Sequence, residues 1–192
     1  DSYLLTTHGD FQANAPILHT SISGVSNHGT NTYGIIFGDG TGNANARGII
    51  PDAQGIFADY GTYGGNRYAH TAQLLLPPYE AVFQSNSWGS GLTSSYSSIS
   101  SEMDDIIFIN DIIICQSQSN AGTTASRPQA WAKNIVAVGG IRHYNTLTDG
   151  DDAWNGGASV GPAADGRIKP DLAHFYDNTL TTTGNGGYTS SF

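Results

Sequence analysis

Two short runs of apolar, mostly β-branched residues place the strongest limit on the fold. They are residues 112–115 (Ile-Ile-Ile-Cys) and residues 135–138 (Ile-Val-Ala-Val). Runs of this length and composition are typical of central strands in a parallel sheet. A third short strand is predicted over residues 81–86, directly before Ser87.

Helical patterns alternate with these runs. Apolar residues follow His28 at helical spacing and predict a helix that begins near His28 and stops at the glycine-rich residues 38–43. A second helix is predicted where Ile99, Met103, Ile106 and Ile107 share one face. The alternation predicts an α/β fold with a doubly wound, mostly parallel sheet and helices on both faces, in three layers. Ligands bind such sheets at the carboxyl ends of the strands, so the loops after Asn86 and Cys115 are the places to look for chemistry.

Composition narrows the classes of function. The chain has 192 residues, of which 38% are hydrophobic and 12% charged, and this suits one globular domain over residues 1–192. Lys and Arg number 7 against 16 Asp and Glu, for a net charge of -9. Because no basic stripe exists, we expect no nucleic-acid partner. No apolar run approaches the roughly 20 residues that span a bilayer, so we expect no membrane partner either.

Residues that often bind metals show weak patterns here. Cys115 is the single cysteine, and its isoleucine neighbours favour buried packing over a nucleophilic role. Calcium could be held by alternating oxygen donors, but neither candidate group has the bidentate acid of a standard calcium loop, so a structural calcium cannot be assigned. The two groups are Asp39, Thr41 and Asn43, and Asp149, Asp151 and Asp152. The remaining histidines lack the paired spacing of a zinc site and are interpreted as surface or loop residues. They are His8, His19, His70, His143 and His174.

The segment His28-Gly29-Thr30 stands at the junction of a loop and a helix. A lone histidine there is usually a capping or surface residue. The pattern His-Gly-Thr-x-x-x-Gly, however, resembles the histidine signature of the subtilisin-like serine peptidases. That family carries its catalytic carboxylate upstream of the histidine and its oxyanion asparagine downstream.

Residues 1–11 resemble the family's aspartate segment, Asp-[Ser/Thr]-Gly followed by His-Pro-Asp-Leu. The resemblance assigns Asp1 as the catalytic carboxylate and Asp10 as a later, structural one. Asp10 remains an alternative for the catalytic role, because Tyr3 replaces the family's glycine and Gly9 its proline.

Two downstream segments complete the expected site. Residues 118–122 resemble Gly-Asn-x-Gly, with Ser119 in place of the first glycine, which implies that Asn120 donates to the oxyanion; an ordinary turn residue is the alternative. Residues 84–89 resemble the segment that pairs with an extended substrate, which implies that Ser87, Trp88 and Gly89 bind substrate.

The last part of the chain resembles the segment that precedes the family's nucleophile. Residues 159–172 carry this likeness, whereas residues 173–176 (Ala-His-Phe-Tyr) depart from the usual Ala-Pro-Gly. The nucleophile itself stands in a Gly-Thr-Ser-x-Ala motif that residues 1–192 do not contain. Ser190 and Ser191 lack its context, so we expect the serine beyond Phe192 and treat the chain as a partial peptidase domain.

The resemblance implies a secreted, monomeric serine endopeptidase that acts on proteins or peptides through an acyl-enzyme. His28 would be the base, Asp1 would orient it, and the chemistry would need no cofactor. Residues 1–192 alone are expected to be inactive. An inactive subtilisin-fold module that binds peptides is one alternative, motivated by Tyr3, Asn31 and Ser119 within the motifs. A metal-dependent hydrolase of another class is a second.

Overall fold

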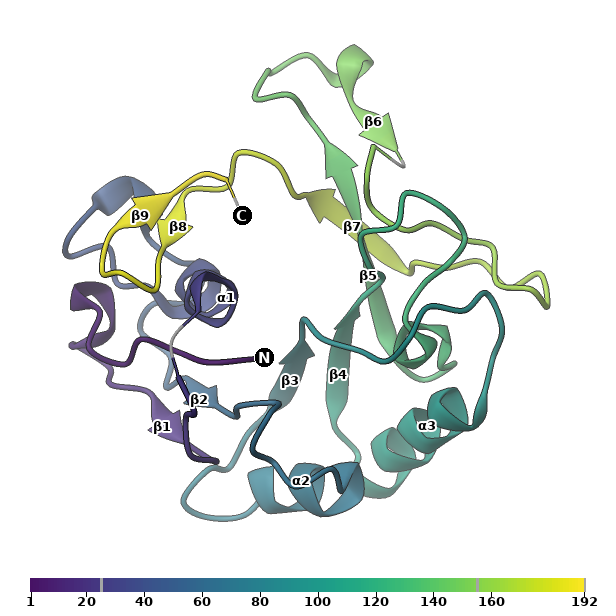
Figure 1. Cartoon of the computed structure of the whole chain (residues 1–192), viewed down its shortest axis with the longest axis horizontal. Coiled ribbons are helices and arrows are strands. Elements are labelled where there is room, and N and C mark those ends of the chain that lie inside the picture. Colours follow the sequence, from purple (N-terminus) through teal and green to yellow (C-terminus); the bar gives the residue numbers. More distant parts are fainter. Residues whose placement is uncertain (25, 155, 192) are drawn as a thin grey trace. The chain divides into compact units, whose positions relative to one another are not determined.

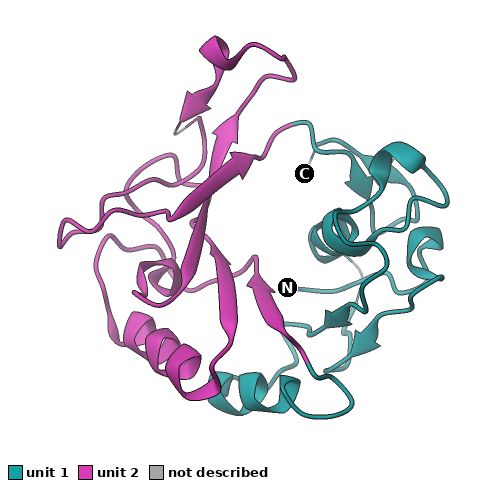
Figure 2. Ribbon diagram, turned by 180° about the vertical axis from the view of Figure 1, so that it is seen from behind, with its two compact units in different colours: residues 1–80, 178–192 teal, residues 81–177 magenta. Residues whose placement is uncertain are grey.

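The computed structural model describes residues 1–24, 26–154 and 156–191. The chain forms two compact units, which Figure 2 distinguishes by colour. The first contains residues 1–80 and 178–192, and the second contains residues 81–177. A single domain over residues 1–192 stays a prediction, and Val25, Asn155 and Phe192 lie outside the described residues.

A five-stranded sheet forms the centre of the second unit (Figure 1). Its strands are β3 (Phe83–Asn86), β4 (Ile113–Ser117), β5 (Val136–Arg142), β6 (Ala153–Trp154) and β7 (Leu172–Phe175). Strands β3, β4, β5 and β7 pair in parallel, and β6 joins β5 antiparallel. The three strands predicted from the sequence are therefore confirmed as β3, β4 and β5.

Burial alternates along β4, so its two faces differ. Ile114 is 1% exposed and Gln116 is fully buried, whereas Ile113 is 61% exposed. A period of two is the usual behaviour of a strand, in which successive side chains point to opposite faces. The apolar run marked the strand correctly without indicating which face is covered.

Helix α3 (Ser98–Asn110) is the second predicted helix. A capping box between Ser97 and Ser100 begins it, and the left-handed Asp111 ends it. Met103 and Ile106 are buried on one face, as the spacing predicted. The short helix η3 (Pro128–Trp131) packs against α3.

The first unit is built around α1 (Asn27–Phe37), the helix expected near His28. Leu4, Phe11, Tyr33 and Phe57 form its apolar core. The smaller elements of this unit are η1 (Gly9–Phe11), β1 (Ile17–Leu18), η2 (Ala44–Ala46), β2 (Ile56–Phe57), α2 (Arg67–Leu74), β8 (Thr181–Thr182) and β9 (Tyr188–Thr189). Strands β1 and β2 pair in parallel, and β8 and β9 form an antiparallel hairpin beside α1 (Figure 1).

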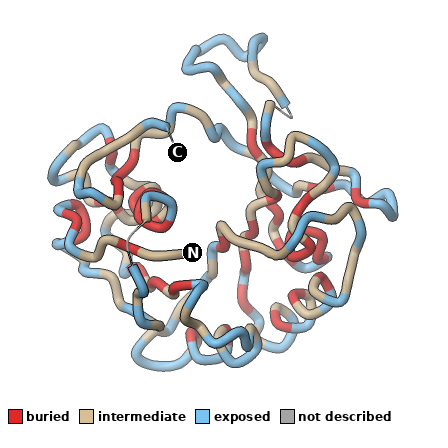
Figure 3. The backbone as a smooth tube through the Cα atoms, viewed as in Figure 1, coloured by how far each residue is buried: buried red, intermediate tan, exposed pale blue. Residues whose placement is uncertain are grey.

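The β8–β9 hairpin is bonded directly to the backbone of α1. The hydroxyl of Thr181 donates to the Asn31 carbonyl and that of Thr182 to the Thr30 carbonyl, each at 2.8 Å. Helix α1 comes this close because Gly34 has no side chain; a Cβ there would lie 2.1 Å from the Thr182 hydroxyl oxygen. Figure 3 shows buried residues on both α1 and β8.

His8 is a loop residue, as expected, but it does not lie on the surface. His8 is 2% exposed, and its Nδ1 accepts the Asp10 N–H at 3.2 Å while its Nε2 lies 3.1 Å from the Gly187 carbonyl oxygen. Asp10 is fully buried beside it and accepts the Tyr188 hydroxyl at 2.7 Å. Sequence spacing could not show this burial, because the partners at 187 and 188 are about 180 residues away.

Candidate active site

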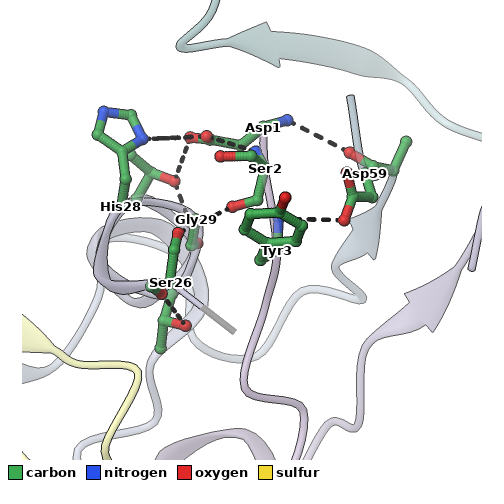
Figure 4. Close-up of polar contacts among 10 residues, drawn as sticks. Asp1, Ser2, Tyr3, Ser26, His28, Gly29 and Asp59 are labelled. Atoms are coloured by element: carbon green, nitrogen blue, oxygen red, sulfur yellow. Dashed lines mark hydrogen bonds and ion pairs between the residues drawn. The ribbon is translucent and has the colours of Figure 1, made fainter. Parts of the chain in front are cut away.

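His28 stands in the first turn of α1 and contacts Asp1. Its Nδ1 lies 3.0 Å from both Oδ1 and Oδ2 of Asp1 (Figure 4). The Asp1 side chain is 11% exposed, whereas that of His28 is 51% exposed. Because Nδ1 faces the carboxylate, Nε2 is the nitrogen left to exchange a proton with a reacting group.

Two further donors orient the Asp1 carboxylate. The Ser2 N–H donates to Oδ1 at 2.6 Å, and the Thr32 hydroxyl donates to Oδ2 at 2.8 Å. Thr32 lies four residues after His28, so both side chains project from the same face of α1. Thr32 was not predicted from the sequence, although its helical spacing from His28 was a usable signal.

Gly29 allows α1 to approach the Asp1 segment. A Cβ at this position would lie 1.8 Å from the Tyr3 carbonyl oxygen and 2.2 Å from the Ser2 carbonyl oxygen. Only glycine fits such a contact without a shift of the backbone. The glycine after the histidine therefore has a steric role in placing His28 next to Asp1.

Partial burial lowers the pKa of His28 below its ordinary value of 6.5, and the positive charge of the Asp1 amino group lowers it further. Both effects favour the neutral imidazole, which is the form that accepts a proton. The alternative carboxylate, Asp10, is bonded to Tyr188 and to the Gly42 N–H instead. The structure brings Asp1 to His28, and it places Asp10 in a separate contact network.

Asn120 is exposed and lies in the second unit, in the loop that follows β4. Buried Ser159 holds this loop: its N–H donates to the Ser119 carbonyl at 2.7 Å, and its hydroxyl accepts the Ala121 N–H at 3.1 Å. Ser119 has φ 117°, a conformation that favours glycine. The serine that departs from the family motif thus keeps a backbone conformation suited to the glycine it replaces.

The expected substrate-binding residues Ser87, Trp88 and Gly89 follow β3 in the same unit. The Trp88 carbonyl accepts from Gln116 Nε2 at 2.5 Å. Gly89 lies against Arg127, whose side-chain atoms would be 2.7–2.8 Å from a Cβ at that position.

Ser90, the next residue, is held by two side chains. The amide of Gln129 accepts the Ser90 N–H at 3.1 Å and donates to the Ser90 hydroxyl at 3.0 Å. Arg127 donates to the Ser90 carbonyl at 2.9 Å. Gln116 and Gln129 are fully buried, so buried side chains that were not predicted from the sequence hold this segment. The polar Gln116, directly after the apolar run of residues 112–115, was a usable signal.

Within residues 1–24, 26–154 and 156–191, no serine hydroxyl is hydrogen-bonded to His28. The Ser191 N–H is bonded to the Thr189 hydroxyl at 3.1 Å. Among the described residues, neither Ser190 nor Ser191 is hydrogen-bonded to Asp1 or His28.

The described part of the chain contains no group of three or more His, Cys, Asp or Glu that could hold a metal ion. The residues considered for calcium bond to their own loops instead. Asp39 accepts the Thr41 N–H at 2.7 Å, Asn43 accepts the Asn45 N–H at 3.1 Å, and Asp151 accepts the Thr146 hydroxyl at 2.9 Å. No helix among the described residues is long and apolar enough to cross a bilayer.

The model of the subtilase family matches residues 8–190. The chain belongs to the subtilase family. Its fold is also that of solved subtilisin-like proteases, and the predicted α/β class is confirmed. Family membership supports a serine protease that acts on peptides. No match to a curated protein was found.

Three similar structures illustrate the likeness. The prenylagaramide maturation protease PagA is 18% identical with a TM-score of 0.75, and the comparison covers 100% of this chain and 66% of that one. The patellamide maturation protease PatA is 16% identical with a TM-score of 0.72, over 100% and 69% of the two chains. Sphericase is 20% identical with a TM-score of 0.72, also over 100% and 69%. The subtilase chain described here thus spans about two thirds of the length of these proteins.

Proposed function

We propose that the chain supplies the aspartate, the histidine and the oxyanion asparagine of a serine endopeptidase. The observation that carries the proposal is the contact of His28 Nδ1 with both carboxylate oxygens of Asp1 at 3.0 Å. This contact fixes the tautomer and ring orientation that a general base requires. The nucleophile would be a serine located beyond Phe192.

In the proposed mechanism, the serine oxygen attacks the carbonyl carbon of the peptide while His28 Nε2 takes the serine proton. The π electrons of the carbonyl move to its oxygen, and the Asn120 amide donates to that oxyanion. Collapse of the intermediate breaks the C–N bond, and His28 returns its proton to the leaving amine. Water then attacks the acyl-enzyme by the same route, with His28 again as the base. Asp1 stays ionised throughout and stabilises His28 while the histidine is protonated.

The proposed substrate is a protein or peptide in an extended conformation along Ser87, Trp88 and Gly89. Pairing with an extended chain uses main-chain groups. Gln116 holds the Trp88 carbonyl here, and Arg127 and Gln129 hold the backbone of the adjoining Ser90. The chemistry needs no cofactor, because a base, a carboxylate and an oxyanion donor suffice for acyl transfer. We further propose that the parent protein is secreted and monomeric.

A catalytically inactive, peptide-binding subtilase is the second candidate, motivated by Tyr3, Asn31 and Ser119 within the motifs. Two of these residues, Tyr3 (φ 57°) and Ser119 (φ 117°), have backbone conformations in the region that favours glycine. The enzyme stays the first candidate because Asp1 and His28 are in contact at 3.0 Å.

Labelling with a fluorophosphonate tests the proposal, because the probe reacts with an activated serine. The parent protein, extended past Phe192, is expected to be labelled, and His28→Ala is expected to reduce peptide hydrolysis by about 10²–10⁴-fold. Asn120→Ala is expected to reduce turnover by about 10²–10³-fold, a magnitude measured in subtilisin itself.

Residues 1–192 alone serve as the matched control and are expected neither to be labelled nor to hydrolyse peptides. Labelling of Ser190 or Ser191 in that control would show the nucleophile assignment to be wrong. An extended protein that binds peptide without labelling would establish the inactive module instead. Activity that is lost with a chelator but is insensitive to the probe would indicate a metal-dependent hydrolase.

A further inference from the structure

Asp59 is a fully buried carboxylate that the proposed chemistry does not use. It follows β2 and accepts backbone N–H groups from three separate places. Its Oδ2 accepts from Tyr3 at 3.3 Å and from Ser23 at 3.5 Å, and its Oδ1 accepts from Gly61 at 2.7 Å. Figure 4 shows it on the side of the Asp1–Tyr3 segment opposite His28. A buried charge with several backbone donors is well suited to hold those segments in place.

The backbone around Asp59 also contacts the Asp1 segment. The Tyr60 N–H donates to the Asp1 carbonyl at 2.5 Å. The Asp59 N–H in turn donates to the Thr20 hydroxyl at 2.7 Å, and the Thr62 N–H donates to the Asp59 carbonyl at 3.1 Å. The loop therefore bonds the segment at Asp1 and at Tyr3, on both sides of Ser2.

Tyr3 needs such support because of its conformation. Its φ of 57° lies in the left-handed region, which costs free energy for a residue with a side chain and little for glycine. The same conformation directs the Tyr3 carbonyl toward α1, where only Gly29 leaves room for it. A relaxed backbone at Tyr3 would shift the adjoining Ser2 N–H and Asp1 carboxylate away from His28.

We propose that Asp59 is a positioning residue, which holds Tyr3 in its left-handed conformation and so presents the Asp1 carboxylate to His28. Asp59 touches neither His28 nor the reacting atoms. Its importance for catalysis rests on the proposed function, whereas its effect on the Asp1–His28 pair does not. Asp59 would then compensate, within the same unit, for the tyrosine that stands where the family motif has glycine.

Nitrogen-labelled residues 1–192 allow the pair to be observed directly by NMR, through the proton on His28 Nδ1 and the titration of His28. Asp59→Asn is expected to weaken or abolish the Nδ1–H signal and to change the proton-binding constant of His28 by about threefold, or half a pKa unit. Asp10→Asn is the matched control, because Asp10 is also fully buried in this unit but bonds to Gly42 and Tyr188. The control is expected to leave both His28 signals unchanged even if it lowers the melting temperature.

A second substitution tests the route by which Asp59 acts. Glycine adopts the left-handed conformation freely, so Tyr3→Gly combined with Asp59→Asn is expected to restore the His28 signals. Unchanged His28 signals in Asp59→Asn, or a double variant that fails to restore them, would overturn the inference. If Asp59→Asn alone does not fold, the double variant decides, since it must fold and show the Nδ1–H signal. An inactive parent enzyme with intact His28 signals would contradict the proposed function alone.

Discussion

Replacing Gly29 with alanine would put a methyl group 1.8 Å from the Tyr3 carbonyl oxygen and 2.2 Å from the Ser2 carbonyl oxygen. Real Cβ atoms do not approach other atoms closer than 3.0 Å, so the contact must open by 3.0 − 1.8, or 1.2 Å. Both obstructing atoms belong to the backbone of the segment that carries Asp1. A shift of this size would lengthen the 3.0 Å contact between His28 and Asp1 beyond hydrogen-bonding distance.

The expected loss of stability follows from two opposing effects. Overpacking of this kind typically costs about 1–3 kcal/mol, and a rigid backbone contact should lie at the upper end of that range. Alanine inside a helix recovers about 0.5–1 kcal/mol relative to glycine. The net expectation is destabilisation by about 2 kcal/mol, which for a chain of this size lowers the melting temperature by about 4–8 °C.

Urea denaturation measures the free energy of unfolding, and the NMR signal of His28 Nδ1–H reports the contact with Asp1. Gly9→Ala is the matched control, because nothing lies within 4 Å of a Cβ at that position. We expect the free energy of unfolding of the control to stay within about 0.5 kcal/mol of that of the unchanged chain. A Gly29→Ala variant that matched the control in stability and kept the His28 signal would refute the steric reasoning.

Three further outcomes are expected. Tyr188→Phe removes the hydroxyl that donates to buried Asp10 and should destabilise the chain by about 1–3 kcal/mol in urea denaturation, whereas Tyr176→Phe, which removes an exposed hydrogen bond, should cost less. Gln129→Leu leaves the Ser90 N–H without its partner and should speed hydrogen exchange of that amide, together with a loss of about 1–3 kcal/mol. Burial lowers the pKa of His70 from 6.5 to about 4, with smaller effects from His19 and the chain amino group, so the neutral form is favoured in the folded state. Its contribution to stability is complete above pH 6.5 and is lost as the pH falls toward 4; His70→Phe should flatten that part of a pH series of urea denaturations.

Periodicity in the sequence was sufficient for the elements that position the site. The apolar runs marked β4 and β5, and the spacing after His28 marked α1, because local patterns reflect local backbone geometry. The burial of His8 and Asp10 could not be predicted in the same way. It depends on Gly187 and Tyr188, which return to this region only through the tertiary fold.

The motif substitutions also show what a sequence can and cannot predict. Tyr3 and Ser119 looked like departures that weakened the resemblance, since a sequence states which side chain is present but not its φ angle. The structure gives both residues the backbone conformation expected of glycine. Their supports, Asp59 for Tyr3 and Ser159 for Ser119, lie 56 and 40 positions further along the chain (59 − 3 and 159 − 119).

The hairpin contacts of α1 also bear on the order in which the chain acquires its structure during synthesis. Thr181 and Thr182 bond to carbonyls 150 and 152 residues earlier, so the first unit stays incomplete until these two threonines have been synthesised. The second unit is continuous from residue 81 to residue 177 and contains its own sheet. Closing the long loop between α1 and the β8–β9 hairpin is slow compared with local pairing. We therefore expect the second unit to fold before the first during synthesis. The Asp1–His28 pair would then form after the sheet of the second unit, although its residues precede that sheet in the chain.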